Sequence, residues 1–437
     1  MTSALFAAAA LLPHGWGRNV LLTWDDAGRL TRVEVNAATT PHATVAAGPV
    51  IPGLPNLHSH AFQRAIAGLT EYRAQEQSSF WSWRMLMYRF ALKLDPDQLE
   101  AIALHLYVEM LEAGYTSVCE FHYVHHDVDG QPYADDATLA VALMRAAHRA
   151  GIGLTLLPVL YRQGGFGGTP PSDAQRRFLN DRESYARLME TKVSCGRIGI
   201  APHSLRALSL DDLQWAAATW RRQPAHIHVS EQTREVEDCL AVHGRRPIDL
   251  LMDTVPVDEH WCLVHATHAD EGERARIAKA KAVVGLCPIT EANLGDGLFD
   301  VPDFLAHGGR FGVGSDSNVR ISVADELRTL EYGQRLIHRQ RNVLGDPTRS
   351  TGRRLFEAAL AGGRQAVGAA NDEAVVTLDA TSHRGDAILD HWLFAADNAA
   401  VVSVDRGGAR LVDQGRHRER ERIAGRYRKT LARLIES

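Results

Sequence analysis

The chain has 437 residues, of which 45% are hydrophobic and 23% are charged, and its formal net charge is -5 at pH 7. This length accommodates one large catalytic domain and a smaller one, and the composition is that of a globular protein. The negative net charge argues against nucleic acid or an anionic membrane as a partner. No stretch approaches the ~18 consecutive apolar residues of a transmembrane helix, so we expect a soluble, cytoplasmic protein.

Residues 1–50 have the pattern of antiparallel strands. The segment 20–36 (VLLTWDDAGRLTRVEVN) alternates apolar and polar residues on both sides of a DDAGR turn, which predicts a β-hairpin. The apolar run LFAAAALLP before it lacks the basic residues of a signal peptide and is too short to span a bilayer. We interpret 1–50 as the N-terminal part of a small β domain.

Eight short, apolar, strand-like segments follow, and helical patterns alternate with them. The predicted strands are 49–58, 115–122, 151–160, 196–203, 224–230, 260–266, 282–289 and 310–316. The predicted helices include 96–113, 136–150, 209–222, 234–252 and 269–280, with N-cap candidates at Asp95, Asp135 and Ser209. Near-continuous apolar strands alternating with helices indicate a parallel sheet covered by helices. Eight such units predict an α/β fold with a (β/α)8 barrel over 51–369.

The barrel prediction requires the functional residues to lie at the carboxyl ends of strands. Chemically capable side chains do stand at these ends, namely His60, Tyr123, His203, His228, His265 and Asp316. An open doubly wound sheet would instead gather its site at one switch point. The distribution over several strand ends therefore favours the barrel.

Residues 370–437 return to the pattern of the N-terminus. The segments EAVVTLDA and AVVSVDRGGARLV alternate as strands do, and a helix is predicted from about Gln414. We expect the two ends of the chain to join into one β-sandwich-like domain, because each is too small to fold alone. The basic run 416–428 contains Glu419 and Glu421, so we interpret it as the solvated face of that helix.

Two further features concern redox state and loops. The five cysteines are widely spaced and form no CxxC pair, which favours buried reduced thiols: Cys119, Cys195, Cys239, Cys262 and Cys287. The Gly/Pro-rich stretch 164–172 (GGFGGTPPS) lacks the Lys-Ser/Thr of a phosphate-binding loop. We interpret it as a mobile flap of the active site.

The histidines at strand ends are candidate metal ligands. His58 and His60 lie two residues apart, so both point to one face of an extended segment. Two strand-end histidines bonded to backbone carbonyls would give the same pattern. In HIHVSEQ, His228 is followed three residues later by Glu231, where a base for water activation is needed. We interpret His226 as a packing or supporting residue, and leave open the roles of His122, His125 and His126.

Asp316 and His265, at two more strand ends, complete the set of candidate residues for the metal site. Asp316 in GVGSDS is interpreted as a ligand or base, and His265 as a group that polarises the attacking water, with a core histidine as the alternative. Three imidazoles and a carboxylate fit Zn2+, and Fe2+ or Mn2+ also accept them. The sequence therefore predicts a hydrolytic metal site.

Two arginines suggest an anionic ligand. Arg206 in APHSLR follows the fourth predicted strand, and Arg84 lies in FWSWRMLMYR after the first. Trp81, Trp83 and Met85 are apolar, so we expect their segment to be buried or to close over a pocket. A guanidinium in that place suits bidentate binding of a carboxylate. A surface position is the alternative for both arginines.

The chain resembles the amidohydrolase superfamily, and the likeness covers most of its length. The motifs that carry it are HSHAFQR, EFHY, APHSLR, HVSEQ and GSDS. Four longer stretches are most similar to the N-formimino-L-glutamate deiminases of histidine degradation: PGLPNLHSHAFQRAIAGLTE, EFHYVHHD, FGGTPPSDAQRRF and HVSEQTREVEDC. They separate the chain from guanine, cytosine and adenosine deaminases.

The resemblance implies a role for each matching residue. The ligands of a single zinc ion are His58, His60, His228 and Asp316. The catalytic residues are Glu231, His265 and Asp316. The residues that hold the substrate are Gln63, Arg84, Tyr123, His203 and Arg206.

The implied reaction is hydrolysis of N-formimino-L-glutamate, a dicarboxylate, to N-formyl-L-glutamate and ammonia. Hydroxide on the metal attacks the formimino carbon, and Glu231 carries the proton to the departing nitrogen. A homodimer is also implied. One alternative is a superfamily deaminase for a purine, pyrimidine or triazine, which predicts a neutral, aromatic pocket. The other is a non-catalytic scaffold, which predicts lost metal ligands.

Overall fold

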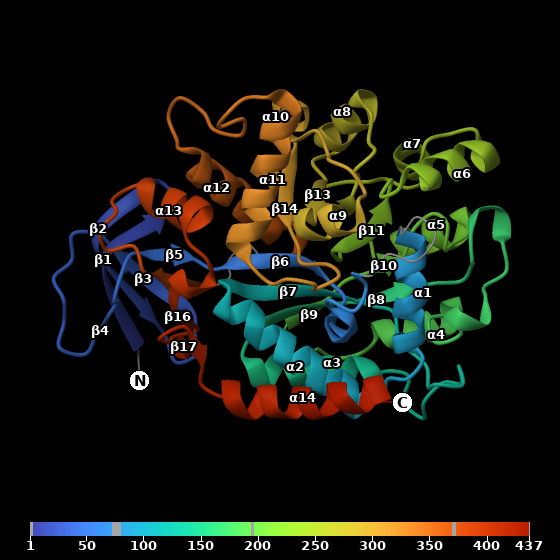
Figure 1. The fold of residues 1–437 in the computed structure, drawn as a ribbon, viewed down its shortest axis with the longest axis horizontal. Coiled ribbons are helices and arrows are strands. Elements are labelled where there is room, and N and C mark those ends of the chain that lie inside the picture. Colours follow the sequence, from blue (N-terminus) through green and yellow to red (C-terminus); the bar gives the residue numbers. More distant parts are fainter. Residues whose placement is uncertain (1–2, 72–79, 194–195, 369–372, 437) are drawn as a thin grey trace.

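The computed structural model describes residues 3–71, 80–193, 196–368 and 373–436. Figure 1 shows a sheet built from both ends of the chain beside a larger body of strands surrounded by helices. The predicted domain boundary at 369/370 lies outside the described residues, and the boundary at 50/51 stays a prediction. Among the described helices, none combines the length and apolar character needed to cross a membrane.

The two chain ends share one nine-stranded sheet. Its strands are β1 (Ser3–Leu12), β2 (Gly15–Trp24), β3 (Leu30–Glu34), β4 (Thr44–Val45), β5 (Val50–Pro52), β15 (Ala374–Leu378), β16 (Val401–Arg406), β17 (Ala409–Asp413) and β18 (Arg416–His417). The predicted hairpin is formed by β2 and β3. Where we expected a sandwich-like pair of layers, the strands are continuous, because β5 pairs directly with β15 and joins the two ends edge to edge.

The larger body contains the eight predicted strands, but the first of them, 49–58, is divided, because β5 belongs to the terminal sheet and only β6 to the larger body. They are β6 (Leu54–Ser59), β7 (Tyr115–His122), β8 (Gly153–Leu160), β9 (Gly196–Ile198) with β10 (Ala201–Pro202), β11 (Ala225–Val229), β12 (Trp261–His265), β13 (Val283–Leu286) and β14 (Arg310–Val313). All pair in parallel, in one sheet from β6 to β10 and another from β11 to β14.

Isolated parallel bridges connect these two sheets on both sides. Ile200 pairs with Ala225 between β10 and β11, and Ser59 pairs with Asp316 between β6 and the end of β14. The strands therefore follow one another around a common interior, as the barrel prediction requires. The second bridge also brings the segment of His58 and His60 beside Asp316.

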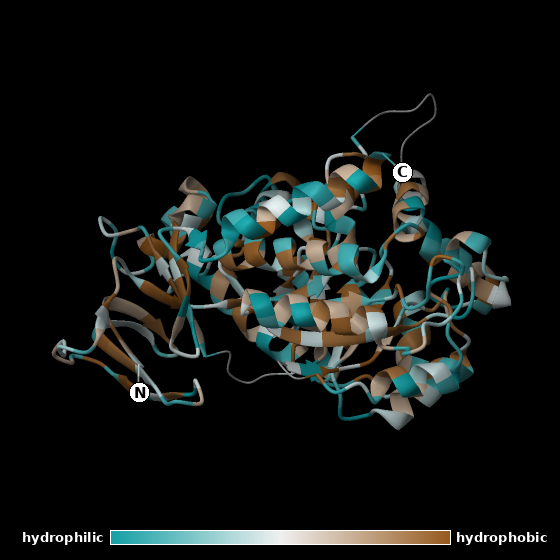
Figure 2. Ribbon diagram, turned by 90° about the horizontal axis from the view of Figure 1, so that it is seen from below, coloured by the Kyte–Doolittle hydropathy of each residue, from teal (hydrophilic) through white to brown (hydrophobic). Residues whose placement is uncertain are grey.

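Helices lie around the strands, as Figure 1 shows. They are α1 (Phe80–Ala91), α2 (Pro96–Glu112), α3 (Thr138–Ala150), α4 (Arg182–Met189), α5 (Leu210–Thr219), α6 (Thr233–His243), α7 (Pro247–Thr254), α8 (Glu271–Ala280), α9 (Pro288–Leu294), α10 (Val301–Ala306), α11 (Val323–His338), α12 (Thr351–Ala366), α13 (Ala387–Ala395) and α14 (Arg420–Glu436). Short 3-10 turns are η1 (Ala61–Ile66), η2 (Phe166–Gly168), η3 (Asp173–Gln175) and η4 (Asn398–Ala400). Figure 2 shows apolar and polar residues mixed on the outer helices, as expected of helices that bury one face.

Proline and glycine explain where the observed elements depart from the predicted ones. The predicted helix 234–252 is divided, because Gly244 ends α6 with a φ of 65° and Pro247 begins α7. The predicted strand 282–289 ends at Leu286, because Pro288 occupies the first turn of α9. The strand 196–203 is interrupted at Gly199 between β9 and β10.

The predicted caps are confirmed at two of three helices. Asp95 and Ser209 accept hydrogen bonds from the first turns of α2 and α5. Asp135 lies two residues before the observed N-cap, since α3 begins after Ala137, whose backbone N–H donates to the Asp135 carboxylate.

The cysteines and the stretch 164–172 can now be placed. The four cysteines within the described ranges are free and buried, and Cys195 lies outside those ranges. The stretch 164–172 forms η2, whose Phe166 ring lies 5.9 Å from that of His243 on α6. No residue of 164–172 lines the pocket described below, so the predicted flap does not reach the site in this arrangement.

Candidate metal centre and substrate pocket

Four predicted ligands converge at the carboxyl ends of the strands. The Nε2 atom of His58 lies 3.1 Å from that of His60 and 3.0 Å from that of His228. Asp316 Oδ1 lies 3.3 Å from His58 Nε2 and 3.2 Å from His60 Nε2. All four side chains are buried, and together they could hold a metal ion.

The tautomers of these histidines support a cation between them. His60 Nδ1 lies 3.0 Å from the carbonyl oxygen of Phe121, and His228 Nδ1 lies 3.1 Å from that of His203. Because a carbonyl only accepts, each Nδ1 carries the proton, and each Nε2 presents a lone pair to the cluster. Lone pairs held about 3 Å apart repel one another unless a cation lies between them. Tetrahedral zinc with nitrogen ligands places its donor atoms roughly 3.3 Å apart, so the donor set fits this metal.

A buried network positions the two ligand-bearing segments. The side chains of Asn56 and Ser315 bond to each other across β6 and the end of β14, with Asn56 Nδ2 2.7 Å from Ser315 Oγ. Ser315 Oγ also donates to Asn318 Oδ1 at 2.6 Å. Asn318 Nδ2 in turn donates to the His60 carbonyl at 2.9 Å. These bonds fix the turn that carries Asp316 against the segment of His58 and His60.

The ends of β12 and β14 have unusual backbone geometry. His265 has a φ of 68°, and Asp316 has a φ of 44°, in the left-handed region that non-glycine residues rarely occupy. Such conformations cost of order 1–3 kcal/mol each and cluster at functional sites. Here they coincide with the residues that face the candidate metal position.

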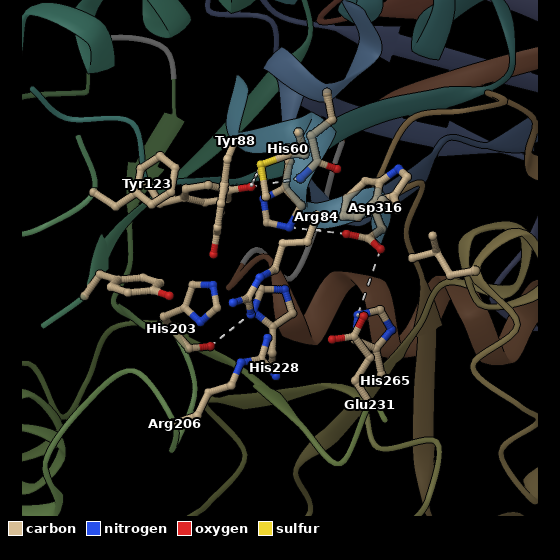
Figure 3. A pocket seen from close by; sticks show the side chains of 16 residues that line it. His60, Arg84, Tyr88, Tyr123, His203, Arg206, His228, Glu231, His265 and Asp316 are labelled. Carbon is tan, nitrogen blue, oxygen red and sulfur yellow. Dashed lines mark hydrogen bonds and ion pairs between the residues drawn. The ribbon is translucent and has the colours of Figure 1, made fainter. Parts of the chain in front are cut away.

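Two further predicted catalytic residues adjoin the cluster. His265 Nε2 lies 3.7 Å from Glu231 Oε1 and 3.9 Å from Asp316 Oδ2. Figure 3 shows the three side chains next to one another. The opposite ring nitrogen, Nδ1, donates to Glu291 Oε1 at 3.2 Å. This bond holds Nε2 toward Glu231 and Asp316, where an attacking water would lie.

Burial and neighbouring charges shift the pKa values of these groups. Burial would lower the pKa of His265, but the carboxylates of Glu231, Glu291 and Asp316 raise it to about 10. Burial raises the pKa of Glu231 above its ordinary value, against the opposing effect of His265 and Arg206. A buried carboxyl with a raised pKa is suited to exchanging protons near neutral pH.

The predicted substrate residues line one pocket above the cluster. Gln63 comes from η1, Arg84 from α1, Tyr123 from the end of β7, and His203 and Arg206 from the segment after β10. Figure 3 shows both guanidinium groups extending toward the middle of this pocket. The segment around Arg84 was expected to be buried or to close over a pocket, and Trp83 and Arg84 do line the pocket. Met85 is 56% exposed, and the Trp81 side chain lies outside the described residues.

A buried carboxylate supports the second arginine. Arg206 is 8% exposed, and its Nη1 lies 3.4 Å from Glu235 Oε2. The same oxygen accepts a hydrogen bond from the backbone N–H of Glu231 at 3.2 Å. A guanidinium has five N–H donors, so Arg206 can bind a carboxylate while it remains paired with Glu235. The site therefore combines a metal-binding cluster with positive charge a short distance away.

Several lining residues were missed by the sequence analysis. The pocket also contains Tyr88 of α1, Tyr161 and Phe178. Tyr161 directly follows β8, so the strand-end rule could have identified it. Tyr88 and Phe178 carry no such signal, because they reach the pocket only through the tertiary packing of α1 and the segment after η3.

Four histidines were left open or treated as supporting residues, and the structure places them away from the cluster. His125 Nε2 lies 2.9 Å from the Val159 carbonyl, and His126 Nε2 contacts the Leu179 carbonyl. His122 is buried against the ring of His125. His226 Nε2 lies 2.9 Å from the Ala366 carbonyl and His226 is not among the four clustered ligands, which agrees with a packing role.

Comparison with known proteins places this geometry in a family. A model of the amidohydrolase family matches residues 50–360. The chain is 49% identical to a formimidoylglutamate deiminase from Pseudomonas aeruginosa, over 99% of this chain and all of that protein. A crystal structure of an amidohydrolase from Brucella melitensis superposes with a TM-score of 0.95 at 47% identity, covering 99% of this chain and all of that one. An adenosine deaminase from Xanthomonas campestris with bound zinc shares the fold, with a TM-score of 0.79 at 17% identity over 99% and 98% of the two chains.

Proposed function

Because the chain belongs to the amidohydrolase family and is therefore a hydrolase acting on a C–N bond, we propose that it deiminates N-formimino-L-glutamate. The products are N-formyl-L-glutamate and ammonia, and the reaction belongs to histidine degradation. The observation that carries this proposal is the pairing of a four-ligand metal cluster with two guanidinium groups in one pocket. The similarity to a formimidoylglutamate deiminase along its whole length supports the same substrate.

The metal that we propose is one zinc ion per chain, held by His58, His60, His228 and Asp316, although Fe2+ or Mn2+ would fit the same donors. When bound, zinc supplies a water acidic enough to act as a nucleophile near neutral pH. The hydrogen bonds from His60 and His228 to backbone carbonyls keep their Nε2 atoms available as donors. This fixed geometry means that little reorganisation is needed on binding.

Glu231 is the proposed proton carrier. It takes a proton from the attacking water and delivers it to the nitrogen that leaves the formimino carbon as ammonia. Its raised pKa and its place 3.7 Å from His265 Nε2 support this role. His265 orients the water from the other side together with Asp316, and Glu291 holds the His265 ring in place.

The glutamyl part of the substrate carries two carboxylates, and we assign them to Arg84 and Arg206, with Gln63, Tyr123 and His203 as further contacts. Gln63 Nε2 lies 2.9 Å from Tyr123 Oη, so these two side chains act as one polar surface. Binding two carboxylates at fixed points orients the formimino carbon toward the metal, which is the positioning effect that raises reaction rates.

A deaminase for a purine, pyrimidine or triazine is the alternative within the family. Such a substrate is uncharged and would form no ion pair with the half-buried Arg84 or the buried Arg206. The pocket has aromatic walls as well, so the arginines are the feature that favours the dicarboxylate. The cytoplasmic location and the homodimer stay predictions.

The experiment that tests the proposal is to incubate zinc-loaded protein with N-formimino-L-glutamate and to measure ammonia while identifying the organic product by mass. We expect ammonia and N-formyl-L-glutamate in equal amounts. Formamide with free glutamate would show hydrolysis of the other C–N bond and would overturn the deiminase assignment. Turnover of an aminated heterocycle without turnover of the dicarboxylate would favour the alternative.

A further inference from the structure

Arg177 is a buried cation with no role in the site described so far. It is 0% exposed, and it lies in the stretch that follows η3. Within the described residues no carboxylate lies in ion-pair distance of Arg177, and its guanidinium bonds to backbone carbonyls instead. Nε donates to the His126 carbonyl at 2.7 Å, and Nη1 donates to the Ala91 carbonyl. Burying a charge is costly, and these two contacts offset part of that cost, together with the nearby groups of Tyr133 and Asp127.

The contact between Arg177 Nη1 and the Ala91 carbonyl fixes the end of α1, a helix that lines the pocket. Ala91 is the last residue of α1, and a guanidinium there satisfies an open carbonyl and favours the negative end of the helix dipole. The same helix carries Arg84 and Tyr88, whose side chains line the pocket, with the Arg84 guanidinium 5.3 Å from the Tyr88 ring centroid. The position of α1 therefore sets the position of Arg84.

The contact between Arg177 Nε and the His126 carbonyl fixes the segment after β7. The backbone N–H groups of His125 and His126 both donate to the Arg177 carbonyl, at 2.9 and 3.1 Å. With the bond from Arg177 Nε, three hydrogen bonds join this segment to residue 177. Tyr123, two residues before His125, lines the pocket. The side chains of His125 and His126 also hold this segment, through their contacts with the Val159 and Leu179 carbonyls.

The residue after Arg177 completes the arrangement. The Phe178 ring lines the pocket and lies 5.0 Å from that of Tyr123 and 5.6 Å from that of Tyr88. The Arg177 guanidinium thus joins two segments, the end of α1 and residues 123–126, to the third segment, which carries Arg177 and Phe178. We call Arg84, Tyr88, Tyr123 and Phe178 the substrate wall, since each lines the pocket and each lies on a segment that Arg177 holds.

We propose that Arg177 is a positioning residue for substrate recognition, which holds α1, the segment 123–126 and Phe178 so that Arg84 faces a substrate carboxylate. This inference rests on the proposed function, because it requires a substrate whose carboxylate binds Arg84. The metal ligands lie on other segments, so loss of Arg177 should change how the dicarboxylate is bound and leave metal chemistry intact.

The test compares Arg177→Met and Arg177→Lys with Arg176→Met. Arg176 is the adjacent residue, but it lies near the surface and bonds to Asp173 and the Val128 carbonyl. For Arg177→Met we expect the KM for N-formimino-L-glutamate to rise roughly ten- to hundredfold, as for a displaced binding group, with kcat and zinc content within about twofold of the wild type. The KM of Arg177→Lys should lie between those of Arg177→Met and the wild type. An ammonium is a point charge and cannot donate to two separate carbonyls as a guanidinium does. Arg176→Met should match the wild type.

A second substrate separates positioning from general damage. Formamidine has the reacting carbon but no carboxylate, so its kcat/KM should be the same in Arg177→Met and the wild type. An equal loss on both substrates would assign Arg177 a purely structural role and overturn the inference. An unchanged KM for the dicarboxylate in both Arg177 variants would overturn it as well.

Hydrogen exchange gives a readout that does not depend on the substrate. In Arg177→Met and Arg177→Lys, the amides of α1 and of 123–126 should exchange faster, while those of β11 and β12 stay unchanged. Unaltered exchange in α1 overturns the inference even if the enzyme proves to act on another substrate. Failure of the wild type to turn over N-formimino-L-glutamate, with faster exchange in the variants, instead overturns the proposed function and leaves the Arg177 contacts supported.

Discussion

Glu231 and Glu237 are six positions apart in the sequence, but they differ in burial and in the groups that surround them. Glu231 is buried beside His265 and Arg206, whereas Glu237 is exposed on α6. Burial raises the pKa of Glu231, and a buried carboxyl whose pKa is raised is suited to proton transfer. In the sequence, the spacing from His228 distinguishes Glu231 from Glu237, and in the fold the two residues differ in burial.

Replacement of Glu231 by Gln should lower kcat by at least about a hundredfold, because general acid–base catalysis contributes that much or more. The amide keeps the size of the side chain but can neither accept nor deliver a proton. The measurement is steady-state ammonia release together with zinc content, which should be unchanged. Glu237→Gln serves as the control and should behave as the wild type. Activity of Glu231→Gln near that of the control would remove Glu231 from the mechanism.

At the residue scale, the strand-end rule explains what could be foreseen. A parallel sheet carries its chemistry where strands end, and His60, His228 and His265 were recognisable for that reason. Glu235 and Glu291 were not, because their carboxylates act by contacting Arg206 and His265, and sequence spacing says nothing about such contacts. Arg177 lies within the motif FGGTPPSDAQRRF, but nothing in the sequence distinguishes a buried arginine from a surface one.

At the element scale, the turn after β14 decides whether the metal ligands are held together. Asn318 has a φ of 57° and bonds to the His60 carbonyl and to Ser59 Oγ. Asn tolerates this left-handed conformation better than most residues. The turn therefore combines a backbone geometry with a side-chain bridge to β6.

Asn318→Gly should weaken metal binding by about 10- to 100-fold, the usual effect of losing a residue that supports a metal ligand. Glycine adopts the same backbone conformation, so the change removes the bridge and little else. The matched control is Asn342→Gly, because Asn342 also has a positive φ of 55° but is exposed at the surface. Affinity is measured by competition with a chelator. Equal affinities for the two variants would show that Asn318 does not position the ligands.

Element boundaries were predictable where local chemistry sets them. Asp95 and Ser209 begin α2 and α5 as expected, because a side-chain oxygen that accepts from the first turn is a local property. The division between α6 and α7 was also readable in principle from Gly244 and Pro247. The continuity of the terminal sheet was not, since pairing of β5 with β15 is a contact between distant parts of the chain.

At the scale of the whole molecule, buried neutral histidines link stability to pH. Burial lowers the pKa of His226 from 6.5 to about 4 and that of His125 to about 3. Between pH 6.5 and these values the unfolded chain binds protons that the folded chain does not. Stability is therefore fully present above pH 6.5 and falls as the pH falls toward 4.

His226→Gln should make this acid dependence shallower. The wild type should lose on the order of 2 kcal/mol at pH 5 through this one residue, since each pKa unit of difference corresponds to about 1.4 kcal/mol. The glutamine amide can donate to the Ala366 carbonyl as His226 does. The measurement is urea unfolding at pH 7 and pH 5, with His42→Gln at an exposed position as the control. The same pH dependence in both variants would contradict this assignment.

The pairing of β5 with β15 has a consequence for the protein during its translation. On the ribosome, β1 to β5 emerge first, and the whole barrel is translated before β15 exists to cover the open edge of β5. An uncovered strand edge is a template for pairing with other chains, so the nascent protein is most exposed to aggregation during this interval. The barrel, whose neighbouring strands follow one another in order of synthesis, is complete before the terminal sheet can close. β15, which is translated after the barrel, thus covers the edge of β5, which is translated before it.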